Sequence, residues 1–288
     1  MPTARSFGTH DGIFHADEVT ACALLISFGF IDRNLIFRTR NESVLEKCEY
    51  VCDVGGLYDS KKKRFDHHPA SYQGDLSSAG MVLKYLQDQK IISKDLYNYF
   101  NEHFILGVDC HDIGTAQLVR GTASFSQVIA NFLPVEYDAK AIELDCAFEE
   151  ALAFVIGYLE RLKKRFLVLE NSRKMISLKM KEKSEFLVFE KAFSWVEPFF
   201  LEGGENHPAL FIVMNMKNSW KLRTVPPSWD QRMKERKQLP EAWAGLEGEE
   251  LERVSKIPGA IFCHKGLFVA YFKTKEAVLK ALHVALEQ

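Results

Sequence analysis

Histidine and aspartate residues gather in four short segments within the first 114 residues of the 288-residue chain. These segments read GTHDGIFHADE (8–18), CDVGG (52–56), RFDHHP (64–69) and GVDCHDIG (107–114). Mixed imidazole and carboxylate ligands are typical of sites for Mn²⁺, Fe²⁺, Co²⁺ or Zn²⁺ rather than Ca²⁺. Two such ions, about 3.5–4 Å apart, can share a carboxylate, activate a water molecule and hold a phosphoryl oxygen. The pattern therefore predicts a two-metal site for the hydrolysis of phosphate esters.

Single residues in these segments have simpler explanations. Asp17 alone would be a residue at a helix start, and Asp53 before two glycines would be a turn former. The combination with the Asp-His-His triplet at 66–68 favours a metal site, because so much anionic charge in one place needs cations to hold it together.

Alternating strands and helices are expected to position these segments. Apolar runs at 35–38 and 49–54 predict buried strands, and apolar residues at helical spacing predict helices over 16–28, 77–87 and 94–104. This alternation predicts a largely parallel α/β sheet. Each of the four segments is then expected at a strand end or strand-to-helix turn, where open α/β sheets place their ligand sites.

The second half of the chain has a different pattern. Residues 139–183 contain no proline and predict one long helix, or two with a break near 170–173. Strand pairs are predicted within 209–225 and 260–272, and a closing helix over 274–287. We therefore expect three parts, a metal-binding catalytic domain (1–138), connecting helices (139–183) and a smaller α+β substrate-contacting domain (184–288).

The motifs resemble those of a known superfamily and, more closely, of one family. The Asp-His-His triplet and the aspartate segments around it are similar to the four motifs of the DHH phosphoesterases, which include RecJ-type exonucleases, oligoribonucleases, manganese pyrophosphatases and exopolyphosphatases. More closely, the chain resembles the MYG family (melanocyte proliferating gene proteins) from residue 8 to about residue 272. The segments that carry this resemblance are GTHDGIFHADE, VCDVGGLYDSKKKRFDHH, LSSAG, VDCHDIG, LPEAWAGL and IPGAIFCHKGLFVA. The resemblance implies a DHH-type fold and the 3′–5′ exoribonuclease activity of the family's eukaryotic members.

The resemblance also implies roles for individual residues. One ion would be bound by His10, His15 and Asp53, and the other by Asp17, Asp53, His67 and Asp109, with Asp53 bridging the two. His68 would lie beside the scissile phosphate and act with Asp53 in catalysis, since adjacent side chains of an extended segment diverge. Asp66 would orient His67, and His111 and Asp112 would have supporting roles.

His15 departs from the superfamily pattern, in which an aspartate stands after a gap of three residues rather than four. A neutral ligand lowers the negative charge of the site, so the metal preference of the pyrophosphatases does not carry over. Mn²⁺ is the favoured ion, with Fe²⁺, Co²⁺, Zn²⁺ and Mg²⁺ as alternatives.

Cationic residues are expected to hold the phosphate oxygens of the substrate. The basic run at 61–64 is best explained as a solvated loop. The candidate substrate-binding residues are therefore those of the last domain: Arg223, Arg232, His264 and Lys265. The segment GAIFCHKG, which contains His264, resembles the glycine-rich, histidine-bearing segment of other DHH enzymes but lacks their GGGH-like string.

The composition sets limits on partners and location. A net charge of −2 gives no overall attraction for polyanions. The six cysteines form no C-x-x-C pair, which is typical of reduced thiols. No signal peptide or membrane span is visible, so a cytoplasmic protein is expected. The sequence is compatible with a homodimer as well as with a monomer.

Three functions are compatible with these patterns. Hydrolysis of RNA or short oligonucleotides from an end is favoured. Hydrolysis of pyrophosphate or polyphosphate is the alternative. The small number of lysines and arginines near the motifs argues against it, because these highly charged anions need many cationic side chains. A metal-stabilised module that binds RNA or protein without catalysis is the third, and the intact set of histidines and aspartates argues against it.

Overall fold

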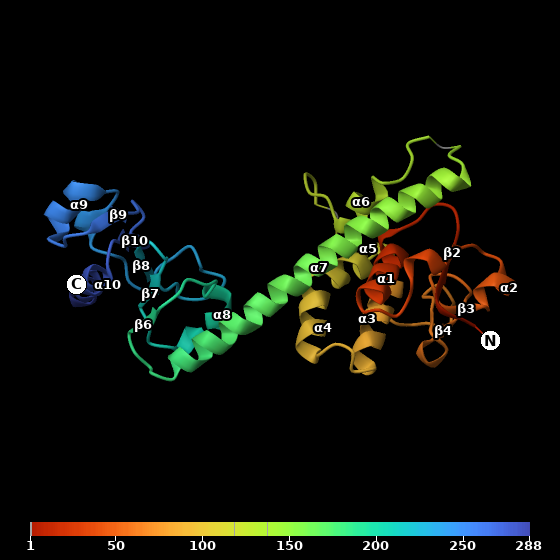
Figure 1. Ribbon diagram of the computed structural model, residues 1–288, viewed down its shortest axis with the longest axis horizontal. Helices are drawn as coiled ribbons and strands as arrows, with labels where there is room; N and C mark the ends of the chain where they lie inside the picture. The colour runs from red at the N-terminus through yellow and green to blue at the C-terminus, as the bar shows by residue number, and fades with distance from the viewer. Residues whose placement is uncertain (1, 118, 137) are drawn as a thin grey trace. The chain divides into compact units, whose positions relative to one another are not determined.

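The computed structural model describes residues 2–117, 119–136 and 138–288. The chain divides into two compact units, Met1–Phe166 and Leu167–Gln288. Each unit contains a five-stranded sheet. Helix α7 (Ala141–Met180) runs without interruption through the boundary, so the structure shows one long helix and no break at 170–173 (Figure 1).

The sheet of the first unit has the order β2-β1-β3-β5-β4. Its strands are β1 (Thr3–Thr9), β2 (Ile36–Arg38), β3 (Cys48–Cys52), β4 (Tyr58–Asp59) and β5 (Arg64–Phe65). The pairs β1–β2, β1–β3 and β3–β5 are parallel, and only β4 pairs antiparallel within this sheet. The predicted, largely parallel α/β sheet is thus confirmed, and the segments that follow β1, β3 and β5 meet at one edge.

Short helices surround this sheet. They are α1 (Ala16–Ser27), α2 (Glu42–Leu45), α3 (Ser78–Asp88), α4 (Lys94–Phe100), a π-helical turn (Asn101–Ile105), α5 (Leu106–Asp112) and α6 (Phe125–Ala130). Short 3₁₀ turns lie at Arg33–Leu35 and Ser60–Lys62.

The fourth histidine and aspartate segment, 107–114, differs from expectation. It does not follow a strand but begins inside α5, which continues the helical stretch that starts at Lys94. Phe100, Phe104 and Val108 are buried and recur every four residues, which is a helical spacing. The apolar residues before 109 therefore form one buried face of a helix instead of a strand.

Helix α1 carries ionisable groups into the core of the first unit. It packs against α3, α5 and α6, and Val19, Ala23 and Leu24 are fully buried along it. Asp17 and Glu18 in its first turn are also fully buried. Carboxylates are almost never buried unless they are paired or bind a metal, so these two require an explanation beyond packing.

The second unit has a sheet with the order β6-β7-β8-β10-β9. Its elements are β6 (Phe186–Phe189), α8 (Val196–Leu201), β7 (Phe211–Asn215), β8 (Trp220–Thr224), α9 (Gly248–Ser255), β9 (Ala260–Cys263), β10 (Val269–Phe272) and α10 (Lys275–Glu287), with 3₁₀ turns at Gly204–Asn206 and Glu241–Trp243. The predicted hairpins β7–β8 and β9–β10 are confirmed as antiparallel pairs. Only β6–β7 is parallel, so this unit is α+β as predicted.

Among the helices of residues 2–117, 119–136 and 138–288, none is long and apolar enough to cross a membrane.

Candidate metal centre

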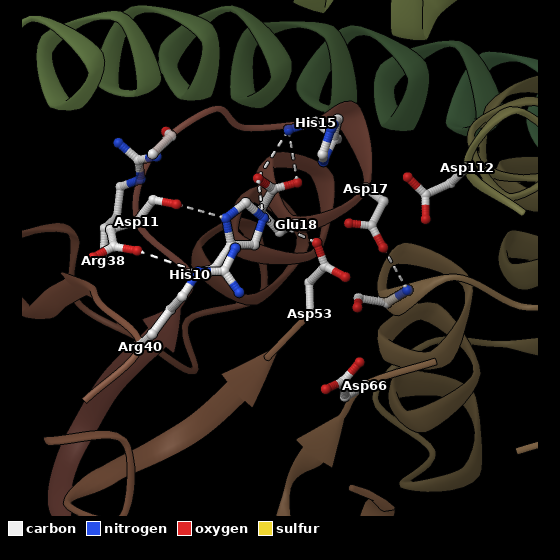
Figure 2. A network of polar contacts seen from close by, with 12 residues as sticks. His10, Asp11, His15, Asp17, Glu18, Arg38, Arg40, Asp53, Asp66 and Asp112 are labelled. Carbon is white, nitrogen blue, oxygen red and sulfur yellow. Dashed lines mark hydrogen bonds and ion pairs between the residues drawn. The ribbon is translucent and has the colours of Figure 1, made fainter. Parts of the chain in front are cut away.

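The first group of possible metal ligands is formed by His10, His15, Glu18 and Asp53. Nε2 of His10 lies 3.3 Å from Oε1 of Glu18 and 3.2 Å from Oδ2 of Asp53 (Figure 2). Nδ1 of the same ring lies 2.9 Å from the backbone oxygen of Asp11. When Nδ1 donates its proton to that oxygen, the Nε2 lone pair points at the two carboxylates, as in a metal-binding histidine.

Electrostatics at His10 show how strongly this group favours a cation. Burial alone would lower the pKa of the imidazole, but the carboxylates of Asp53 and Glu18 raise the pKa of His10 to about 10. A positive charge at this position, supplied by a proton or by a metal ion, is therefore stabilised by its surroundings.

Two further groups adjoin the first. The second group contains Asp53, Asp66, His67 and His68, and the third contains Asp17, His67 and Asp112. Nδ1 of His67 lies 3.7 Å from a carboxylate oxygen of Asp17 and 3.7 Å from one of Asp53, and its Nε2 lies 3.0 Å from Oδ2 of Asp112. Asp53 belongs to the first two groups, so its carboxylate lies where two ion positions would meet.

Three buried atoms at this junction have no hydrogen-bond partner: Oδ1 of Asp17, Oδ1 of Asp53 and Nδ1 of His67. Burial first, and then the neighbouring Asp53 and Asp112, raise the pKa of Asp17 well above its usual value. Buried polar atoms without partners are costly. Divalent cations would satisfy all three atoms and lower the repulsion between the carboxylates, so the residues present fit a metal centre.

The turn after β3 places Asp53 in an uncommon conformation. Its φ angle is 57°, in the left-handed region that non-glycine residues seldom adopt. The chain continues through Gly55 and Gly56, also at positive φ, and the N–H of Gly56 donates to Oδ2 of Asp66 over 2.7 Å. The ends of β3 and β5 are thereby held together.

Asp66 orients a different histidine from the one expected. Its Oδ1 accepts the backbone N–H of His68 over 3.0 Å and lies 2.9 Å from Nδ1 of the His68 ring. His67 instead contacts Asp17, Asp53 and Asp112. Asp66 therefore acts on His68, because its carboxylate faces the residue two positions further along the chain.

Asp109 and Asp112 occupy different environments on α5. Oδ1 of Asp109 accepts hydrogen bonds from the backbone N–H of Ser77 (3.1 Å), the hydroxyl of Ser77 (2.7 Å) and the N–H of Gly80 (3.0 Å). Asp109 is thus held at the N-terminus of α3 and lies outside the three groups. Burial raises its pKa to about 6, although these hydrogen bonds oppose that shift. Asp112, nearly one turn later, faces His67.

Glu18 is a site residue that the sequence reasoning left out. Its carboxylate accepts the N–H of His15 over 2.9 and 3.0 Å, and it lies in the first group with His10. A glutamate three residues after the residue that precedes a helix is normally explained as helix capping. Complete burial of that glutamate is the observation that distinguishes the two roles, and burial is not visible in the sequence.

A cavity of about 1070 Å³ opens over these groups. His10, His15, Asp53, Asp66, His67, His68, His111 and Asp112 are among its lining residues, and so is Arg40, which the sequence reasoning also left out. His111 is in none of the three groups and lies 3.5 Å from the hydroxyl of Ser124.

The substrate-binding residues predicted for the last domain are in the second unit, where two of them share an aromatic side chain. The guanidinium carbon of Arg223 lies 4.9 Å from the ring centroid of Phe268, and the His264 ring lies 4.4 Å from it. Burial lowers the pKa of Arg223. Lys265, next to His264, is exposed.

Arg232 is separate from this cluster. Its guanidinium carbon lies 4.8 Å from the ring centroid of Trp229. The structure therefore brings together Arg223 and His264 on Phe268, whereas Arg232 contacts Trp229.

The fold and the cluster define a class of α/β protein with candidate histidine and carboxylate metal ligands gathered near the carboxyl ends of parallel strands. The chain belongs to the MYG1 exonuclease family, described as uncharacterised protein family UPF0160, whose model matches residues 6–286. The MYG family resemblance is thus confirmed. The chain is 46% identical over 288 residues to the MYG1 protein of Chlamydia trachomatis, covering 100% of this chain and 99% of that protein.

More distant relatives are also similar to this chain. It is 30% identical over 325 residues to the human MYG1 exonuclease, covering 98% of this chain and 85% of that protein. Among solved structures, RecJ of Thermus thermophilus in complex with Mn²⁺ matches with a TM-score of 0.29 and 13% identity, over 99% of this chain and 52% of RecJ. This chain thus spans about half the length of that RecJ chain.

Proposed function

We propose that this protein is a divalent-metal-dependent phosphoesterase that removes nucleotides from the 3′ end of RNA or short oligonucleotides. The observation that carries the proposal is the set of three buried, unpartnered atoms on Asp17, Asp53 and His67, two of which belong to residues that line a cavity large enough for a nucleotide, Asp53 and His67. The name of the human relative, MYG1 exonuclease, supports the same reaction.

The ligands divide between two ion positions. We assign His10, His15, Glu18 and Asp53 to one and Asp17, Asp53, His67 and Asp112 to the other. We give Asp112 the place first given to Asp109, because Asp109 lies outside the three groups; Oδ1 of Asp109 accepts from Ser77 and Gly80, and its buried Oδ2 has no hydrogen-bond partner. Mn²⁺ is the favoured ion, because imidazole and carboxylate ligands are mixed.

Bound divalent ions supply charge neutralisation and a lower pKa for an attacking water. His68 provides a further group, since its side chain is 64% exposed and lines the cavity. Oδ1 of Asp66 lies 2.9 Å from Nδ1 of His68 and orients the ring. A proton on Nε2 could then be donated to a nonbridging oxygen of the phosphate, and this bond strengthens as charge develops in the transition state.

The second unit provides groups that suit a nucleotide chain. Arg223, His264 and Lys265 offer donors to phosphate oxygens, and Arg232 stacked on Trp229 offers a flat surface for a base. We propose that these residues contact the substrate beyond the bond that is cleaved.

One assay separates the three functions. Purified protein with Mn²⁺ is given 5′-labelled RNA, 5′-labelled DNA, pyrophosphate and polyphosphate side by side, with Asp53→Asn as the inactive control. Progressive shortening of the labelled RNA from its 3′ end is expected. Release of phosphate from pyrophosphate or polyphosphate alone would favour the phosphoanhydride alternative. No turnover of any substrate, with metal bound, would favour the non-catalytic module.

A further inference from the structure

The cavity over the metal-binding groups is lined by five histidines and several carboxylates. Four aspartates line it, Asp11, Asp53, Asp66 and Asp112. Among the described residues that line it, Arg40 is the single lysine or arginine. A phosphodiester that enters this cavity meets four aspartates, five histidines and one guanidinium, which makes Arg40 the one permanently charged cationic side chain of the described lining.

The backbone fixes Arg40 close to the metal-binding end of β1. The N–H of Thr39 donates to the backbone oxygen of Thr9 over 2.7 Å, which continues the β1–β2 pairing past Arg38. Arg40 and His10 follow these two residues directly. In Figure 2, Arg40 extends from the lower left to a position below the His10 ring, and Asp17 and Asp112 lie on the right of that ring. Arg40 is thus at the edge of the first ligand group.

Two residues earlier, Arg38 shows what a structural arginine looks like in the same segment. Its side chain is 5% exposed, and it donates to Asp145 over 2.6 Å and to the backbone oxygen of Gly12. Its guanidinium carbon lies 4.9 Å from the ring centroid of Phe148. Arg38 is therefore held by several partners and is not available to a ligand.

Arg40 has none of this support. Its side chain is 67% exposed, and its ion pair with Asp11, itself 57% exposed, is 3.4 Å long. Ion pairs between exposed groups are weak and exchange readily with water or other ions. The guanidinium can therefore leave Asp11 for a better anionic partner.

We propose that Arg40 forms an anion subsite beside the metal centre and binds the nonbridging oxygens of a substrate phosphodiester. A guanidinium fits two such oxygens at once, which a lysine cannot do. This inference rests on the proposed function for the identity of the anion, a phosphate of an oligonucleotide. The opposing explanation is that Arg40 only holds Asp11 and the loop after β1.

Three variants distinguish these explanations: Arg40→Ala, Arg40→Lys and Asp11→Asn. Arg33→Ala is the matched control, because Arg33 forms an exposed ion pair with Glu149 and does not line the cavity. For each variant we would measure bound Mn²⁺, KM and kcat on an oligoribonucleotide, and the Kd of a fluorescein-labelled phosphorothioate pentanucleotide by anisotropy at several salt concentrations.

Arg40→Ala should keep its Mn²⁺ and raise KM and Kd by about tenfold or more, as expected for loss of a charged hydrogen bond. The slope of log Kd against log salt should fall by about 1. The KM and Kd of Arg40→Lys should lie between those of the parent protein and those of Arg40→Ala. Asp11→Asn should bind as tightly as the parent or more tightly, since it releases Arg40, and Arg33→Ala should be unchanged.

Two outcomes would overturn the subsite. If Asp11→Asn loses Mn²⁺ and affinity to the same degree as Arg40→Ala, the pair is structural. If Arg40→Ala binds and cleaves like the parent, Arg40 does not contact the substrate. The anisotropy measurement needs no turnover, so a protein that hydrolyses nothing but loses affinity on Arg40→Ala would refute the proposed function and retain the subsite.

Discussion

The imidazole rings of His67 and His68 stack on each other, with centroids 4.3 Å apart and an angle of 26° between their planes. Their side chains do not diverge as expected for an extended segment. Both lie near Oδ1 of Asp53. Their other partners differ, because His67 contacts Asp17 and Asp112 and His68 contacts Asp66. The His67 side chain is 12% exposed and that of His68 is 64% exposed. Two adjacent residues of the same type thus have different environments, since His67 is mostly buried among carboxylates and His68 is mostly exposed to the cavity that both line.

His68→Ala should keep both metal ions and near-native substrate affinity, while kcat falls by roughly a hundredfold, the usual scale for loss of one donor to the transition state. His67→Ala should deplete one ion and lose activity that excess Mn²⁺ partly restores. Metal analysis by mass spectrometry and initial rates on labelled RNA measure both. Depletion of an ion by His68→Ala but not by His67→Ala would mean that the two roles are exchanged.

Asp53→Asn should lose more bound metal than any other single substitution, because Asp53 belongs to two ligand groups. The parent protein should hold about two transition-metal ions per chain after mild dialysis, and EDTA should lower its Tm, since ions that bind only the folded state stabilise it. His10→Ala is the comparison and should affect one ion. Equal loss of both ions in His10→Ala would contradict a shared role for Asp53.

Asp112→Asn should mainly affect metal binding, whereas Asp109→Ala should mainly affect the stability of the fold. Asp112→Asn should weaken Mn²⁺ binding with little change in the Tm of the metal-free protein, because the side chain lines the cavity. Asp109→Ala should lower the free energy of unfolding by about 2–4 kcal/mol, because it leaves buried donors of Ser77 and Gly80 without an acceptor. Isothermal titration with Mn²⁺ and urea unfolding of the metal-free variants measure the two effects. If Asp109→Ala has normal stability but no longer binds Mn²⁺ normally, Asp109 is a metal ligand after all.

Gly80→Ala should destabilise the fold, since a Cβ atom there would lie 2.2 Å from Oδ2 of Asp109. The expected loss is about 1–3 kcal/mol, as for other overpacked positions. Gly107→Ala is the matched control, because it lies in α5 with nothing within 4 Å of the added atom. It should stabilise the protein by up to about 1 kcal/mol. Thermal unfolding of both metal-free variants tests the contrast, and equal Tm values would show that the contact with Asp109 is not restrictive.

Arg223→Ala should raise KM for oligonucleotides by about tenfold and leave bound metal unchanged, because Arg223 lies with His264 on Phe268 in the second unit. Arg253→Ala, an exposed arginine of α9, is the control and should match the parent. Steady-state kinetics on RNA and on bis-p-nitrophenyl phosphate should show the defect only with RNA. A defect of the same size with the small ester would place Arg223 at the reacting phosphate instead.

The sequence by itself determined the parallel sheet and the positions of three ligand segments. Short apolar runs followed by His or Asp are local patterns, and the carboxyl ends of parallel strands always meet at one edge. His10, Asp53 and the triplet at 66–68 could therefore be placed together without coordinates. The family resemblance followed from the same local motifs, and the family match over residues 6–286 confirms it.

Only the tertiary structure decided which carboxylates face the site. Asp109 and Asp112 are both acidic residues of one short segment, and contacts with Ser77, 32 residues away in sequence, turn Asp109 toward α3. Asp17 is likewise held by the N–H of Ser78, 61 residues away. Burial of Glu18 and the exposure of Arg40 depend in the same way on what packs around them. Such contacts join distant parts of the chain, so local spacing does not specify them, and the direction of each side chain is set only when the helices pack on the sheet.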